Sequence, residues 1–336
     1  MELDEFLTEW HNEHPTVMVH TSGSTGTPKP IWVEKRRMLN SARITCEFLK
    51  LKPHDTALLC MPLDFIAGKM MVVRSLERHL ELLNVRPSGH PLSDASLSTL
   101  DNPLTAITFA AMIPLQVYNS LQIPEETERL RRIKHLIIGG GAIDDSLSKA
   151  LQSFPNAVWS TYGMTETLSH IALRRLNGGA ASGWYEPFDS VNVSLNDDGC
   201  LIIDAPLVCD GPLLTNDRAE LRKVKGIDGG EKIQFRIIGR KDNVINSGGI
   251  KIQIEEVEKA LRQHLKVPYV ITKRPNKKFG EEVVLLTESA DLQTVRGICT
   301  SVLPKYWQPH HYQTISTIPT TGTGKIAREK ARLLVE

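Results

Sequence analysis

The sequence predicts an α/β fold: a large N-terminal α/β domain with a mostly parallel sheet plus a β-rich segment, then a small C-terminal α+β domain. Two observations support this prediction. Over the first two-thirds of the chain, short apolar segments alternate with helical segments, as they do in βαβ units. After residue 190, apolar and polar residues alternate around turn-forming residues, which is typical of antiparallel strands.

The strands expected in the parallel sheet are short and almost entirely apolar, as strands buried on both faces should be. They cover residues 16–20, 56–60, 82–85, 106–109, 135–138 and 157–160. Helices are expected between them, for example over residues 35–49 and 68–80. This alternation supplies the crossover connections that parallel strands require.

The remaining chain begins with a predicted β-hairpin, closed by an Asn-Asp-Asp-Gly turn at residues 196–199. Strands are also expected at residues 232–238 and 282–287. Between them an amphipathic helix is predicted, because apolar residues recur at helical spacing: Ile254, Val257, Leu261 and Leu265. We therefore divide the chain into an N-terminal domain, residues 1–241, and a C-terminal domain, residues 242–336.

Composition excludes several classes of protein. The 40 Lys and Arg residues nearly balance the 39 Asp and Glu residues, which excludes a strongly basic nucleic-acid-binding protein. The longest apolar run, residues 106–115, is too short to cross a bilayer, and the polar N-terminus is unlike a signal peptide. The five cysteines lack the spacing of a zinc or redox motif. We expect a cytoplasmic protein with reduced cysteines and no membrane insertion.

Four polar clusters each follow directly on an expected strand. They lie at residues 21–29, 61–65, 139–141 and 162–166. In open parallel sheets, ligands bind outside the carboxyl ends of the strands. We therefore expect the four clusters to line one cleft.

The first cluster is typical of a phosphate-binding loop, because hydroxyl and N–H donors stand among glycines that let the backbone approach an anion. Its residues are Thr21, Ser22, Gly23, Ser24, Thr25, Gly26 and Lys29. The spacing is not that of a Walker A loop. A flexible Ser/Gly linker is the alternative, which the preceding apolar strand and the following Pro-Lys pair disfavour.

Two further groups are candidates for the same site. Tyr162, Thr165 and Glu166 combine a ring that can cover a base, a hydroxyl that can donate to phosphate and a carboxylate that suits Mg²⁺. On its own, a Thr-Glu pair is also a common helix start. Lys325 ends a loop, residues 319–325, whose proline and glycines favour a fixed charge over a solvated tail lysine.

In this order, the segments resemble the motifs of the adenylate-forming superfamily, which includes acyl-CoA synthetases, adenylation domains and luciferases. The resemblance covers almost the whole chain. The matching stretches are TSGSTGTPK (21–29), GGGAI (139–143), YGMTE (162–166), TNDRAEL (215–221), RKDNVINSGGIKIQIEEVE (240–258) and PTTGTGK (319–325). Within the superfamily, residues 60–76, 162–178 and 203–210 look most like the o-succinylbenzoate–CoA ligases of menaquinone biosynthesis, in the short form of some bacteria.

The resemblance implies an enzyme that joins a carboxylic acid to ATP, releases pyrophosphate and then passes the acyl group to coenzyme A. Mg²⁺ is the implied cofactor, and residues 21–29 would hold the β- and γ-phosphates. The other implied contacts are Gly139, Gly140, Gly141 and Tyr162 at the adenine, Asp217 and Arg240 at the ribose, Thr165 at the α-phosphate, Glu166 at Mg²⁺ and Lys325 at the reacting carboxylate.

The resemblance also implies that the C-terminal domain is mobile and turns about Asp242 between the two half-reactions. The loop that carries Gly248 and Gly249 would then enter the cleft, where glycines leave room for pantetheine.

The acyl group of o-succinylbenzoate has a second carboxylate, so its pocket should contain a cation or strong donors. The substrate-binding candidates are Phe65, Lys69, Gly163 and His170. We prefer Lys69 as the cation, although Lys69 and Arg74 are also explained as exposed helix charges, Arg74 at least as well as Lys69. Related ligases often carry a histidine where this chain has Phe65.

The leading interpretation is an acyl-CoA ligase. The alternatives are an enzyme that activates another acid or loads a carrier protein, and a catalytically silent nucleotide-binding protein. The phosphate loop begins about 20 residues from the N-terminus, whereas most relatives carry a longer segment there. We therefore expect the usual N-terminal subdomain to be absent or truncated, and a homodimer that covers the surface so exposed.

Overall fold

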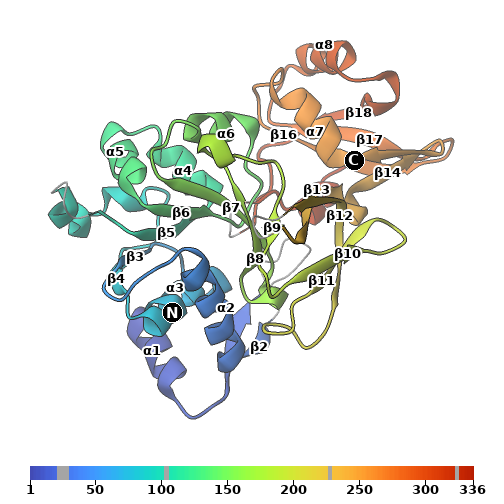
Figure 1. The fold of residues 1–336 in the computed structure, drawn as a ribbon. Coiled ribbons are helices and arrows are strands. Elements are labelled where there is room, and N and C mark those ends of the chain that lie inside the picture. The colour runs from blue at the N-terminus through green and yellow to red at the C-terminus, as the bar shows by residue number, and fades with distance from the viewer. Residues whose placement is uncertain (21–29, 102–105, 226–228, 322–324) are drawn as a thin grey trace.

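The structure is a computed structural model that describes residues 1–20, 30–101, 106–225, 229–321 and 325–336. Its largest unit is a seven-stranded sheet in the order β4-β3-β5-β6-β7-β8-β9 (Figure 1). Pairing is parallel from β4 to β7 and antiparallel at β8 and β9, which confirms the predicted α/β fold. The strands are β3 (Thr56–Leu59), β4 (Glu81–Asn84), β5 (Phe109–Met112), β6 (His135–Ile138), β7 (Ala157–Gly163), β8 (His170–Arg175) and β9 (Glu186–Pro187).

Helices lie on both sides of this sheet, with α2 and α3 on one side and α4 to α6 on the other (Figure 1). This arrangement explains the apolar strands, because a strand between two helical layers is buried on both faces. All four residues of β5 are buried, for example. The helices are α1 (Leu3–His11), α2 (Lys35–Phe48), α3 (Ile66–Arg78), α4 (Pro114–Ser120), α5 (Pro124–Arg132) and α6 (Asp145–Leu151).

One strand that we expected in the parallel sheet lies outside it. The strand β1 (Thr16–His20) pairs antiparallel with β2 (Pro30–Glu34) in a separate two-stranded sheet. Only residues 21–29 connect the two strands, and a parallel crossover needs about a dozen residues or more. The strand itself is confirmed with its predicted bounds, but its expected place in the parallel sheet is wrong. A single parallel bridge still places His20 beside Phe65, at the end of the large sheet.

The β-rich segment is a four-stranded antiparallel sheet in the order β10-β11-β12-β13. Its first two strands form the predicted hairpin around residues 196–199. The strands are β10 (Asn192–Leu195), β11 (Cys200–Asp204), β12 (Leu213–Lys225) and β13 (Glu231–Arg240). This sheet matters for the site because Asp217 of β12 pairs directly with Arg240 of β13.

The C-terminal segment forms a five-stranded sheet, in which β15, β14, β17 and β16 follow one another and β18 pairs with β17. Its main core begins at Ile245, whereas the core of the preceding chain ends at Phe235, so the expected boundary lies between the two cores. The elements are β14 (Val244–Ser247), β15 (Ile250–Gln253), α7 (Ile254–Arg262), β16 (Tyr269–Asn276), β17 (Gly280–Thr287), α8 (Leu292–Val302), β18 (His311–Thr314) and α9 (Arg328–Leu333).

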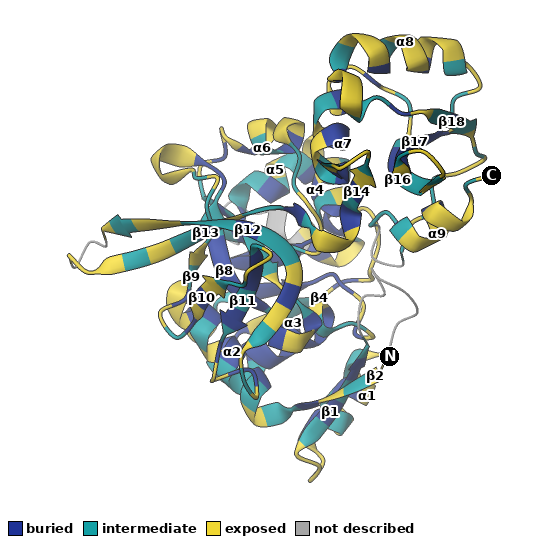
Figure 2. Cartoon of the chain, turned by 90° about the vertical axis from the view of Figure 1, so that its right-hand side faces the viewer, coloured by how far each residue is buried: buried dark blue, intermediate teal, exposed yellow. Residues whose placement is uncertain are grey.

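Burial differs between these parts. Figure 2 shows α8 as largely exposed, whereas the large sheet and α3 contain long buried stretches. All five cysteines are buried, and none of them forms a disulfide in the structure. Within the described ranges, no helix is both long and apolar enough to span a membrane.

Candidate active site

A pocket of 230 Å³ lies at the carboxyl ends of the parallel strands, where three of the four predicted clusters meet. Residues after β3, β6 and β7 line it together with residues of α3. The contributions of the three clusters are Met61, Pro62, Phe65, Gly139, Gly140, Gly163, Met164 and Thr165. Lys325 also lines this pocket, although it comes from the far end of the chain.

The fourth predicted cluster, the phosphate loop of residues 21–29, lies outside the described residues, as do residues 322–324 of the lysine loop. His20 is the residue directly before the phosphate loop, and it lines the pocket next to Phe65. The last residue of β1 therefore lies at the pocket.

Two glycines of the pocket are needed for close packing. A Cβ atom on Gly163 would lie 2.2 Å from the carbonyl oxygen of Ser169. A Cβ atom on Gly139 would lie 2.4 Å from Thr161 Oγ1. Gly140 has a φ of +77°, which favours glycine, and Gly141 lies behind it against Pro114. Gly139 and Gly140 thus form a part of the pocket wall without side chains.

Three residues expected at the nucleoside form one connected group. The Tyr162 hydroxyl donates to Asp217 Oδ2 (2.7 Å), and Arg240 Nη1 donates to Asp217 Oδ1 (3.1 Å). Burial and the charge of Asp217 raise the pKa of Tyr162, so its hydroxyl stays a donor. The ring of Tyr162 packs against Tyr185 and Phe235. The register between β12 and β13 places Asp217 opposite Arg240, although the two residues are far apart in the sequence.

Lys325 is held in a turn and reaches the same group. Thr321 N donates to Lys325 O (2.7 Å), and Lys325 N donates to Thr321 Oγ1 (3.1 Å). Burial lowers the pKa of the Lys325 ammonium below its ordinary value; the charge of Asp217 opposes this change and that of Arg240 adds to it. The structure therefore brings a partly buried lysine of the C-terminal segment into the pocket of the N-terminal domain.

Thr165 and Glu166 follow β7 in a short 3₁₀ helix, η3 (Thr165–Thr167). Thr165 is buried and lines the pocket, whereas Glu166 is exposed beside it. The described ranges contain no group of three or more potential metal ligands. A single exposed carboxylate still fits Mg²⁺, which commonly binds through one or two carboxylates, substrate phosphates and water.

Lys69 does not reach the pocket, which corrects our expectation for the acyl site. Its ammonium donates to Met18 O (2.8 Å) and pairs with Glu9 (3.2 Å), on the side of α3 that faces α1 and β1. Lys69 and Arg74 are five positions apart, which turns them about 140° from each other around a helix. Only one of these two cations can therefore face the pocket.

Arg74 is the cation that lines the pocket, and it is only 2% exposed rather than a surface charge. Its Nη2 donates to Ser169 Oγ (2.6 Å), and its buried Nε has no hydrogen-bond partner. No carboxylate of the described residues forms an ion pair with it. Burial lowers the pKa of Arg74 to about 10. Arg74 follows Ala67 by seven positions, two helical turns, so both lie on one side of α3, but only the structure shows that this side faces the pocket.

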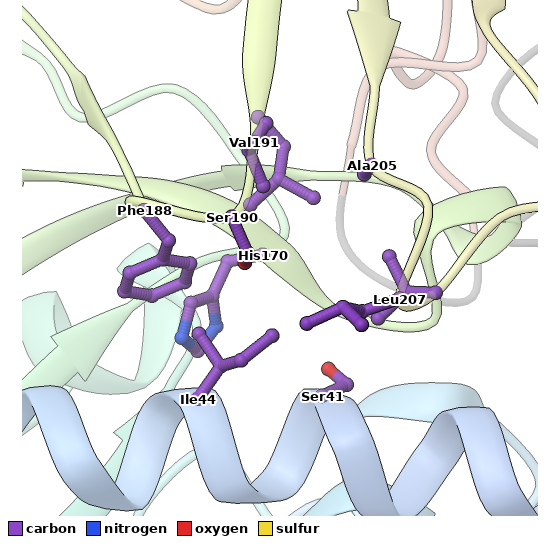
Figure 3. A pocket seen from close by; sticks show the side chains of 10 residues that line it. Ser41, Ile44, His170, Phe188, Ser190, Val191, Ala205 and Leu207 are labelled. Atoms are coloured by element: carbon purple, nitrogen blue, oxygen red, sulfur yellow. The ribbon is translucent and has the colours of Figure 1, made fainter.

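His170 lines the pocket, but it does not bring a positive charge to it. Its Nε2 lies 3.1 Å from Thr45 Oγ1 and its Nδ1 lies 3.2 Å from Ser169 Oγ. Burial and the charge of Arg74 lower the pKa of His170 well below its ordinary value, so the ring is neutral. His170 also borders a second, small cavity next to Phe188 and α2 (Figure 3).

The expected hinge and glycine loop lie away from the pocket lining. Asp242 accepts from Arg240 Nη2 (2.7 Å) and Asn216 Nδ2 (3.3 Å). Gly248 and Gly249 form the turn between β14 and β15, with φ values of +57° and +84°. Neither glycine lines the pocket. Their entry into the cleft therefore stays a prediction.

Known proteins match the chain over most of its length. Residues 4–204 match the AMP-binding enzyme family. The 2-succinylbenzoate–CoA ligase of Haemophilus influenzae is 27% identical over 98% of this chain and 73% of its own. A crystal structure of an AMP-forming acyl-CoA synthetase/AMP-acid ligase II-like protein from Dyadobacter fermentans is 31% identical, with a TM-score of 0.62 over 97% of this chain and 91% of that one.

The fold also matches a more distant solved structure. The o-succinylbenzoate CoA synthetase of Bacillus subtilis, solved with the acyl-adenylate intermediate, has a TM-score of 0.73 and 21% identity over 94% of this chain and 68% of its own. The family match covers more than half of the chain and includes the pocket walls formed after β3, β6 and β7. The chain therefore belongs to the AMP-binding enzyme family, as its motifs predict.

Proposed function

We propose that the chain activates 2-succinylbenzoate and transfers it to coenzyme A in menaquinone biosynthesis. It is an AMP-forming acid–CoA ligase that uses ATP. The choice of acid is the part that goes beyond family membership. Relatives with this name support the choice, and one observation in the pocket carries it.

That observation is Arg74, a buried guanidinium without a carboxylate partner in the described part of the chain. A buried charge is costly unless it is paired, so such a residue fits a site that a ligand anion completes. Arg74 and Lys325 line the same pocket. An acid with two carboxylates can present one of them to each cation. Phe65, Ile66, Met112 and Leu168 also line the pocket and suit the aromatic ring between the carboxylates.

In the first half-reaction, we propose that an oxygen of the substrate carboxylate attacks the α-phosphorus of ATP. The new O–P bond forms as the bond to the leaving pyrophosphate breaks, and pyrophosphate takes the bonding electrons. Lys325 lines the pocket and would offset the negative charge that builds up, an effect that is stronger at a site shielded from water. Bound Mg²⁺, held by Glu166, would offset charge on the phosphates. Thr165 would donate to the α-phosphate.

The nucleoside is assigned to the group around Tyr162. Asp217 and Arg240 would bind the ribose hydroxyls, while Tyr162 and the side-chain-free wall at Gly139 and Gly140 border the adenine. Residues 21–29 would hold the β- and γ-phosphates.

In the second half-reaction, the thiolate of coenzyme A attacks the acyl carbon and AMP leaves. We propose that the part after residue 241 turns about Asp242, which withdraws Lys325 and brings Gly248 and Gly249 to the cleft. The separate hydrophobic cores before and after the boundary support such a movement, because each part keeps its own core.

Pyrophosphate release with a panel of carboxylic acids tests the function. We expect 2-succinylbenzoate to be preferred over its monocarboxylate analogues 3-benzoylpropanoate and 2-butanoylbenzoate. Formation of the thioester should require coenzyme A. Equal use of all three acids would refute the proposed substrate, and acyl transfer to a carrier protein in place of coenzyme A would refute the proposed acceptor.

A further inference from the structure

We propose that Thr45 and His170 are positioning residues that fix the direction of Arg74 in the acyl pocket. This inference rests on the proposed function, because it concerns how the second carboxylate is recognised. The two residues act through Ser169, which is the hydrogen-bond partner of Arg74 Nη2. They connect helix α2 to α3 through the start of β8.

The directions of the hydrogen bonds follow from the number of protons available. Thr45 has one hydroxyl proton and donates it to the carbonyl oxygen of Ser41 (3.1 Å). Thr45 Oγ1 must then accept from His170, so the proton of the neutral imidazole is on Nε2. Nδ1 is left as an acceptor and receives the Ser169 hydroxyl. The oxygen of Ser169 has lone pairs left and accepts from Arg74.

Each member of this chain of hydrogen bonds therefore has one orientation. If Thr45 loses its hydroxyl, His170 can place its proton on either nitrogen. With the proton on Nδ1, His170 can no longer accept from Ser169, and Ser169 can turn its hydroxyl elsewhere. Arg74 then loses the partner that holds one end of its guanidinium, while its unpaired Nε still lacks one.

The environment supports a role beyond packing. Thr45 is fully buried, with no exposed surface, and His170 is 8% exposed. His170 lines both the acyl pocket and a small cavity of about 10 Å³ beside Ser41 and Phe188 (Figure 3). The small cavity is at the lower limit of space for one water molecule. On the side of the small cavity, the ring therefore has little water to replace a protein partner. The series of hydrogen bonds ends at Arg74, a pocket cation that forms no ion pair within the described residues.

Binding an anion at Arg74 is easier when the guanidinium is already oriented, because less rotamer freedom is lost. Loss of one hydrogen bond between Thr45 and Arg74 in this series should raise the KM for 2-succinylbenzoate by about tenfold. The kcat and the KM for ATP should stay close to the wild-type values. Lys325 and the residues expected at the nucleoside form no hydrogen bond with Thr45, His170, Ser169 or Arg74 within the described residues. A purely structural role would instead change all kinetic constants together.

The test compares three variants in the pyrophosphate-release assay. Thr45→Val keeps the shape but removes the hydroxyl, and Thr45→Ser restores the hydroxyl. Thr127→Val is the matched control, because Thr127 Oγ1 also donates to a backbone carbonyl, that of Ser120 (3.0 Å), on a helix away from the acyl pocket. We expect the KM for 2-succinylbenzoate to rise only in Thr45→Val. His170→Phe, of similar volume, should give the same result if Thr45→Val folds poorly.

The outcomes separate this inference from the proposed function. If wild-type enzyme uses 2-succinylbenzoate and both monocarboxylate analogues equally, there is no second-carboxylate site, and both proposals are wrong. If wild type prefers 2-succinylbenzoate but Thr45→Val and His170→Phe keep its KM, the positioning role alone is wrong. Equal rises in the KM for ATP and for the acid would also overturn it. A rise confined to the acid, rescued by Thr45→Ser, would support it.

Discussion

Arg74 allows a prediction in which stability and activity change in opposite directions. Burial lowers its pKa from the ordinary value to about 10, which corresponds to about 3 kcal/mol against the charged form in the folded protein. Because the pKa is lowered, this cost is fully present below about pH 10 and is relieved as the pH rises further. Arg74→Met removes the charge and keeps an unbranched side chain of similar length.

The substitution also removes the hydrogen bond to Ser169, which is worth about 1.5–3 kcal/mol for a charged donor. The two effects nearly cancel, so we expect the free energy of unfolding to stay the same or to rise by about 1 kcal/mol. Activity should fall, because truncating one partner of a buried charged pair costs about 2–5 kcal/mol. We expect kcat/KM for 2-succinylbenzoate to drop about 100-fold or more.

Lys69→Met on the same helix is the matched control. Lys69 is also buried, but it pairs with Glu9 and is not a pocket residue. Removing it leaves a half-buried carboxylate without its partner, so this variant should lose about 1–3 kcal/mol of stability and keep the wild-type KM. Urea unfolding and pyrophosphate release measure both quantities. The reasoning is refuted if Arg74→Met is strongly destabilised with an unchanged KM, or if Lys69→Met raises the KM.

Three further predictions concern the nucleotide side of the pocket. Lys325→Ala should abolish adenylation but spare thioester formation from supplied acyl-adenylate; equal loss of both half-reactions would contradict the proposed alternation. Because burial lowers the pKa of Lys325, the adenylation rate should fall with rising pH earlier than expected for an exposed lysine, and a pH–rate profile without that fall would argue against a protonated lysine. Gly163→Ala should cost about 3 kcal/mol or more of stability, since its Cβ would lie 2.2 Å from a carbonyl oxygen; urea unfolding like that of wild type would show that the backbone gives way.

The sequence was most informative where structure depends on local pattern. The bounds of β6 agree with the prediction, and α2 and α3 begin and end within two residues of it. The strand expected at residues 106–109 lies at Phe109–Met112 instead. The apolar run continues up to Pro114, the first residue of α4, so the apolar pattern alone did not mark the bounds of the strand. Strands with many polar residues, such as β12, were not predicted, since their pairing partners rather than their own pattern define them.

The grouping of the residues that we expect at the nucleotide was also largely predictable. The resemblance named Tyr162, Asp217, Arg240 and Lys325 together, and the structure brings these four residues to one group. Each of these residues lies in a short motif on which the resemblance rests. The acyl side has no such motif, and there our expectation for Lys69 was wrong.

The sequence by itself determined the fold class, the order of the motifs and the presence of two cations on one helix. Only the tertiary structure decided which cation serves the pocket. The physical reason lies in α3, where residues 68–75 are all buried. A helix that is buried on every side has no polar stripe to mark its outer face. Its rotation is set by the segments packed around it, which leaves Lys69 to Glu9 and Arg74 to the pocket.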